Sequence, residues 1–208
     1  MNILTDPLPQ SVYIGGKDYL INTDFTVGVR FELLMQQRDL SEQQRLLGAL
    51  ALYYPTLPPD LPAALDALLW FYRCGRADTA PPKHGEATKK TKSPQKAYCF
   101  EQDAALIVAA FWQAYGINLT AAQDLHWWVF RALFCALPAE CELCKIMSYR
   151  LADTKGMDKR QKEHYAQMKR QFALKDEVDA AATLTLAERN QRLIDYVARR
   201  FGEAVDRT

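Results

Sequence analysis

The sequence has no long hydrophobic run and almost no net charge. Its longest uninterrupted apolar stretch, Ala104–Trp112, is far shorter than the roughly 20 residues of a membrane-spanning helix. Met1–Gln10 contains no basic region followed by an apolar run, so no signal peptide is visible. A formal net charge of +1 over 208 residues gives no overall attraction to nucleic acid or to membranes. We therefore expect a soluble protein that stays where it is made and binds neither.

Cysteines are few, and their number is odd. An odd count without a secretory signal favours free thiols over a disulfide framework. The nearest approach to a metal motif is Cys141-x-x-Cys144, but a structural zinc site needs about four ligands and the sequence offers no second pair at a suitable spacing. We expect thiols here, with no metal and no cofactor, and keep a structural metal as the minor alternative. The five cysteines are Cys74, Cys99, Cys135, Cys141 and Cys144.

Recognisable catalytic constellations are also missing. Gly15-Gly16 lacks the glycine pattern, the lysine and the following helix of a phosphate-binding loop, so a plain hairpin turn is the better interpretation. His126 could act as a general base, but no serine or cysteine nucleophile has a motif around it. A hydrogen-bonded structural histidine is favoured, and we expect a protein that is not an enzyme.

The residues that are present predict a mainly α fold. The composition is 49% hydrophobic and 11% aromatic, enough for one sizeable core or a core with an appendage. Residues 11–21 predict a short N-terminal β-hairpin around Gly15-Gly16. Capping residues, prolines and apolar spacing predict a bundle of about seven helices. The expected helices cover about 24–38, 41–54, 61–74, 100–115, 120–137, 140–151 and 185–205.

Three of the four tryptophans fall in Ala104–Leu137, which the sequence predicts to be two helices joined by a short turn. Thr120 with Gln123 would form the capping box of the second helix. Both helices are apolar around most of their circumference, and such helices are usually enclosed by neighbours. We therefore expect this pair at the centre of the fold.

We expect a core domain over residues 1–152 and a C-terminal helical extension over 153–208. Within the core, residues 76–97 combine prolines with lysines and predict a solvated loop, with a basic docking segment as the alternative. In the extension, Met157–Leu174 is highly charged with a narrow apolar stripe, sufficient to lie against one surface. A solvated helix face is favoured there over a nucleic-acid groove.

Several short segments carry a resemblance when taken in order along the chain. They are residues 2–9, 21–25, 30–31, 70–75, 98–103, 109–111, 115–119, 125–128 and 130–133, followed more thinly by segments up to 174. The most specific are Tyr115-Gly-Ile-Asn-Leu119 and Leu125-His-Trp-Trp128. Together they resemble the "gene product fifteen" family of siphophage tail proteins over about residues 1–175.

The resemblance implies a role in tail morphogenesis, as a non-enzymatic tail assembly chaperone in the bacterial host cytoplasm. Such a protein would keep the tape measure protein soluble while tail tube subunits polymerise around it. The tape measure protein would be its partner, with the tail tube protein and self-association as further possibilities. Two alternatives stay open. One is a minor structural tail component retained in the virion, and the other is a nucleic-acid or metal-binding regulator that uses Lys83–Lys96 and the Cys141/Cys144 pair.

Large aromatic residues are the candidates for binding a protein partner. Tryptophans at helical spacing are more often core residues than ligand cages, but an exposed one would be the best anchor for a partner. The candidates are Trp112, Tyr115, Trp127, Trp128 and Phe201.

Overall fold

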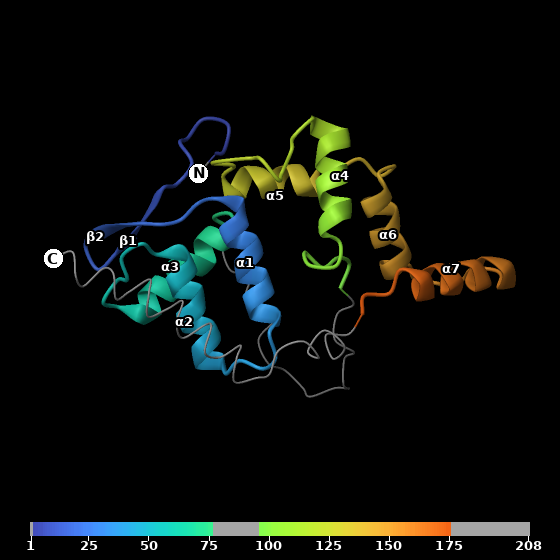
Figure 1. The fold of residues 1–208 in the computed structure, drawn as a ribbon, viewed down its shortest axis with the longest axis horizontal. Coiled ribbons are helices and arrows are strands. Elements are labelled where there is room, and N and C mark those ends of the chain that lie inside the picture. Colours follow the sequence, from blue (N-terminus) through green and yellow to red (C-terminus); the bar gives the residue numbers. More distant parts are fainter. Residues whose placement is uncertain (1, 77–95, 176–208) are drawn as a thin grey trace. The chain divides into compact units, whose positions relative to one another are not determined.

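The computed structural model of the chain describes residues 2–76 and 96–175. Within them lie seven α-helices and one two-stranded antiparallel hairpin (Figure 1), which confirms the expected mainly α fold. The helix predicted over 185–205 and most of the loop predicted over 76–97 lie outside the described residues. The elements are β1 (Ser11–Ile14), β2 (Lys17–Leu20), α1 (Phe25–Gln36), α2 (Glu42–Tyr53), α3 (Leu61–Tyr72), α4 (Ala104–Tyr115), α5 (Trp127–Cys135), α6 (Glu142–Leu151) and α7 (Lys159–Gln171).

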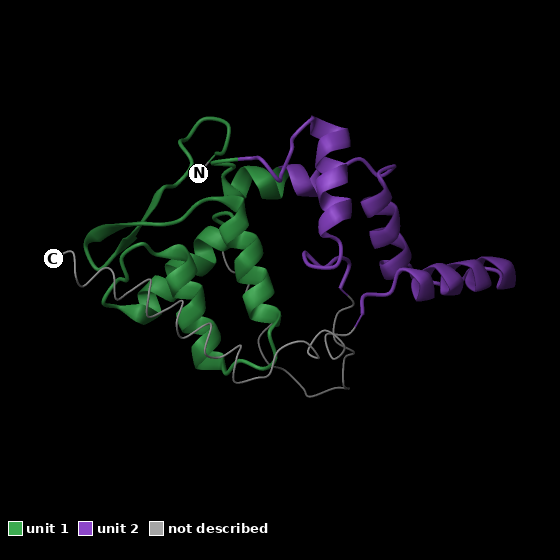
Figure 2. Ribbon diagram, in the orientation of Figure 1, with its two compact units in different colours: residues 1–77, 123–132, 178–208 green, residues 78–122, 133–177 purple. Residues whose placement is uncertain are grey.

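The described residues form two compact units (Figure 2). Unit 1 contains the hairpin, α1 to α3 and residues 123–132, while unit 2 contains residues 96–122 and 133–175. The last residues of α5, from Leu133, therefore count with unit 2. The helices on either side of the predicted boundary at residues 152–153, α6 and α7, share unit 2.

The N-terminal hairpin forms where it was predicted. Gly15 and Gly16 have φ angles of +57° and +87°, which suit both central positions of a two-residue turn and which glycine adopts without strain. Val12 and Ile14 point to one side of β1 and are buried, while Tyr13 between them is 71% exposed. The buried side provides the contact of β1 with α3.

The first three helices also begin and end near the predicted residues. The Asp24 side chain accepts a hydrogen bond from the first turn of α1, and Ser41 with Gln44 forms the predicted capping box of α2. After α3, Gly75 has a φ of +70°, as expected for a helix end. The ends of these three helices are therefore determined mainly by residues close to them in the sequence.

Aromatic rings build the core of unit 1. Phe31 and Phe71 each meet Tyr53 edge-on, with ring centroids 5.7 and 6.0 Å apart. The Trp127 indole is fully buried and Trp128 is 5% exposed. Tertiary contacts among aromatic side chains of α1, α2, α3 and α5 therefore hold these short helices together.

The helix predicted from Thr120 is wrong at its start, because α5 begins at Trp127. The residues just before α5 pair with the residues just before α1, and the amide of Phe25 donates to the carbonyl of Leu125 over 2.8 Å. Asp124 has a φ of +56°, which residues of a right-handed helix do not adopt. Pairing with a segment distant in sequence thus overrides the local capping pattern.

In unit 2, α7 lies against α6 through the predicted narrow stripe. The ring of Tyr149 stacks on Phe172 at 6.0 Å and meets Tyr165 edge-on at 5.9 Å. No residue of α7 is buried. The charged remainder of the helix is solvated, as its composition predicted.

Candidate protein-binding surface

One side of α4 is an exposed apolar surface. Ile107, Ala110 and Phe111 recur at helical spacing and are buried, which fixes the inner side of the helix. The expectation that Ala104–Leu137 forms an enclosed two-helix pair is therefore wrong, because the other side of α4 is open and residues 116–126 separate it from α5. The open side, here called the α4 face, consists of Ala104, Ala105, Val108, Ala109 and Trp112, with Gln113 and Thr120 at its edge.

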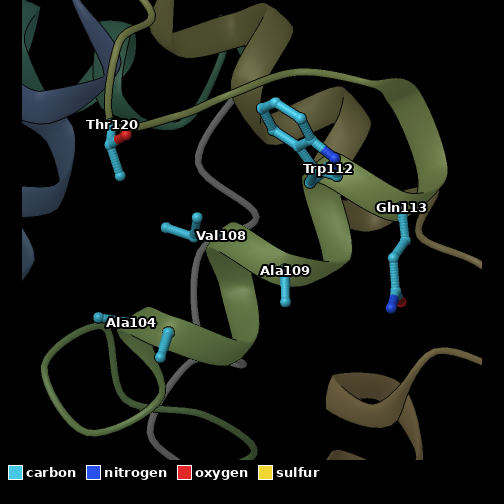
Figure 3. Close-up of a pocket in the computed structure, with 7 residues that line it drawn as sticks. Ala104, Val108, Ala109, Trp112, Gln113 and Thr120 are labelled. Atoms are coloured by element: carbon cyan, nitrogen blue, oxygen red, sulfur yellow. The ribbon is translucent and has the colours of Figure 1, made fainter.

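A shallow hollow runs along the α4 face. Its volume is about 550 Å³. Figure 3 shows Ala104, Val108 and Trp112 following one another along the helix, with Thr120 on a neighbouring segment. The distance between the axes of two packed helices is usually about 8–10 Å and is shorter where the side chains are small. Because alanines form much of the floor of the hollow, another helix could pack against α4 at a distance of about 8 Å.

Trp112 dominates this surface. It is 57% exposed, the highest value among the four tryptophans, and no charged residue occurs in α4. Exposed tryptophans in apolar surroundings are enriched among the residues that contribute most to protein–protein binding. The α4 face therefore has the chemistry of a docking surface for an apolar helix or strand.

A buried ion pair holds the beginning of α4 in place. The guanidinium of Arg150 on α6 contacts both carboxylate oxygens of Asp103, at 2.6 and 2.9 Å, and both side chains are buried. Arg150 also donates to the backbone carbonyls of Ala97 and Phe172, at 3.0 and 2.7 Å. Asp103 in turn accepts from the amide of Cys99. One arginine thus ties the segments around α4, α6 and α7 into a single unit.

The other candidate anchors have different surroundings. Trp127 and Trp128 are core residues whose indole nitrogens donate to the carbonyls of Tyr72 and Phe71, at 2.9 and 2.7 Å. Tyr115 is half-buried, and its hydroxyl donates to the carbonyl of Leu133 at 2.9 Å. Phe201 lies outside the described residues. Of the four candidates within the described residues, Trp112 is the most exposed.

The two candidate chemical sites have structural explanations. The Cys141 sulfur caps α6 by accepting from the amide of Cys144, and burial raises the pKa of the Cys144 thiol to about 11. His126 contacts the carbonyl of Pro9 through Nε2 at 3.1 Å, while its Nδ1 accepts from the amide of Trp128. These contacts confirm the hydrogen-bonded structural histidine, and burial lowers its pKa.

Sequence reasoning missed the alanines of the α4 face and the buried pair beneath it. The apolar stretch 104–112 was interpreted as enclosed on all sides, although alanine is concentrated on one of them. That concentration of small side chains was the available signal. Asp103 and Arg150 lie 47 positions apart in the sequence, so no local sequence pattern could predict their pairing.

Comparison with known proteins assigns the family. A family model described as Bacteriophage Gp15 protein matches residues 4–174. The chain belongs to this family. The match includes the whole α4 face and confirms the resemblance predicted from the ordered segments, so the chain is a bacteriophage protein. No curated protein and no solved structure matches it. None of the helices in the described residues is long and apolar enough to cross a bilayer.

Proposed function

We propose that the protein is a non-enzymatic tail assembly chaperone that binds the tape measure protein in the host cytoplasm. The observation that carries this proposal is Trp112, exposed on the uncharged α4 face of a phage Gp15 family protein. A tape measure protein is expected to be a long helical chain with apolar stripes. A helix with such a stripe could lay its side chains along the α4 face.

The energetics fit a transient partner. Aromatic anchors at the centre of an interface typically contribute about 2 kcal/mol or more, which is roughly thirtyfold in affinity. The α4 face is one helix wide, and surfaces of that size are characteristic of weak or transient complexes. A chaperone that must release its client during tail tube polymerisation needs such an interaction.

Co-expression with the phage tape measure protein tests the proposal. Wild-type protein should raise the fraction of tape measure protein that stays in the soluble extract. Trp112→Glu should abolish most of this effect, because it places a charge on an apolar contact surface. Tyr13→Glu is the matched control, since Tyr13 is an exposed aromatic residue of the hairpin, and it should behave like wild type.

Two results would count against the proposal. One is a soluble fraction of tape measure protein that does not change when wild-type protein is present. The other is an equal loss of the effect in Trp112→Glu and Tyr13→Glu, which would show that the effect does not depend on the α4 face.

A further inference from the structure

Two thiols meet at the first turn of α6. Cys141 is the N-cap of this helix, and its Sγ accepts a hydrogen bond from the amide of Cys144 at 3.4 Å. Cα atoms three residues apart in a helix lie about 5 Å from each other, within the roughly 4.4–6.8 Å that disulfides span. The Cα–Cβ bonds of a helix tilt toward its N-terminus, so the Cys144 side chain leans toward Cys141. The backbone of α6 is therefore already suited to a disulfide between the two cysteines.

Both sulfurs are within reach of small molecules. Cys141 and Cys144 are half-buried free thiols, and the two glutamates that flank Cys141, Glu140 and Glu142, are exposed. The Cys144 thiol donates only over a long contact, 3.9 Å to the carbonyl of Leu137, so little opposes its rotation. The glutamates repel anions, and the fitting reactant is a small disulfide without negative charge.

The two cysteines differ in how readily they react. Burial, together with the adjacent Cys141 side chain, raises the pKa of the Cys144 thiol to about 11, so this thiol is almost wholly protonated at neutral pH. Because the thiolate is the nucleophile in disulfide exchange, Cys141 attacks first and Cys144 second. Once Cys141 is joined to the sulfur of the reactant, its own thiol no longer opposes the ionisation of Cys144, which favours the second attack.

We propose that Cys141 and Cys144 form a thiol–disulfide exchange site that reacts with small disulfides and closes into an internal disulfide. In the first step the Cys141 thiolate attacks the small disulfide and forms a mixed disulfide, and the leaving sulfur takes up a proton from water. In the second step Cys144 Sγ loses its proton to water and attacks Cys141 Sγ, which releases the second small thiol. The cysteine pair is thereby oxidised by two electrons, and the small disulfide is reduced to two thiols. This site does not depend on the chaperone function.

Mass spectrometry of the full-length protein tests the proposal. The reduced protein is incubated with bis(2-hydroxyethyl) disulfide, which carries no charge, and the remaining thiols are then blocked with iodoacetamide. Trypsin releases residues 132–145 as one peptide with three cysteines, and its fragments distinguish them. We expect a disulfide between Cys141 and Cys144 within a monomer. Cys135, which is exposed and outside the pair, should instead carry the reagent as a mixed disulfide.

Three serine variants make the result specific. Cys144→Ser should lose the internal disulfide and keep the reagent on Cys141, because no second thiol remains to release it. Cys141→Ser should also lose it, and its Cys144 should react about tenfold more slowly than Cys141 does in Cys144→Ser. Serine can cap α6 in place of Cys141, so this variant keeps the fold. Cys135→Ser is the matched control and should form the internal disulfide like the wild type.

Three results would overturn the proposal. The first is wild-type protein in which Cys141 and Cys144 stay reduced while Cys135 carries the reagent. The second is a wild-type mixed disulfide on Cys141 that never closes onto Cys144. The third is a disulfide that joins Cys135 to either member of the pair, or that is lost in Cys135→Ser.

Discussion

Replacing Trp128 by alanine tests the division of the tryptophans into core and surface. The Trp128 side chain is 5% exposed, and its Nε1 donates to the buried carbonyl of Phe71 at 2.7 Å. Buried tryptophan-to-alanine changes typically cost about 3–5 kcal/mol through lost burial and the cavity left behind. The Phe71 carbonyl would lose one donor but keep the amide of Cys74 at 2.9 Å, so we expect a value near the middle of that range.

The assay is urea unfolding followed by circular dichroism. A loss of about 4 kcal/mol should lower the midpoint by about 2 M urea, for a slope of about 2 kcal/mol per molar. Trp112→Ala applies the same chemical change at a 57% exposed position and should alter the free energy of unfolding by no more than about 0.5 kcal/mol. A loss below about 1 kcal/mol for Trp128→Ala would refute the assignment of this residue to the core, as would equal losses in the two variants.

Three further predictions concern packing, the buried ion pair and pH. Gly28→Ala should destabilise unit 1 by about 1–3 kcal/mol or more in the same assay, because a Cβ at this position would overlap the Trp127 ring. An unchanged free energy of unfolding would show instead that the ring can move. Asp103→Ala should lower the free energy of unfolding by about 3–5 kcal/mol, because it leaves the Arg150 guanidinium buried without its carboxylate. Arg150→Met should also destabilise the protein. A wild-type unfolding midpoint for Asp103→Ala would contradict this prediction. Burial lowers the pKa of His126 below its ordinary value of 6.5, so the unfolded chain binds the proton more readily than the folded chain. The free energy of unfolding should therefore fall as the pH drops below about 6.5. In thermal unfolding measured across this pH range, His126→Gln should remove that part of the pH dependence, and an unchanged profile would contradict the prediction.

Local sequence patterns predicted much of the fold because local interactions determine it. The Gly15-Gly16 turn and the Ser41/Gln44 capping box need only neighbouring residues, and both appear where the sequence placed them. The start of α5 could not be predicted in this way. Thr120 offered a plausible cap, but backbone pairing between the segments before Phe25 and Trp127 decides the conformation there, and that pairing links residues about 100 positions apart.

The candidate surface was predicted only in part, for a related reason. Periodicity showed that α4 is apolar on more than one side, and such helices are commonly enclosed. Whether a second apolar side is covered depends on which other segments pack there, which the sequence of the helix does not encode. Trp112 was correctly named as a candidate anchor, but only the structure separates it from the buried Trp127 and Trp128.

The central claim is that the α4 face binds the tape measure protein during assembly. Its most direct test is a pull-down of the tagged protein from host cells that are producing phage, with the purified virions analysed in parallel by mass spectrometry. We predict that tape measure peptides are recovered with the wild-type protein, that Trp112→Glu loses them, and that finished virions lack this chain. Recovery of the chain from virions at a fixed copy number, or a pull-down without tape measure peptides, would contradict the claim and favour a structural tail component.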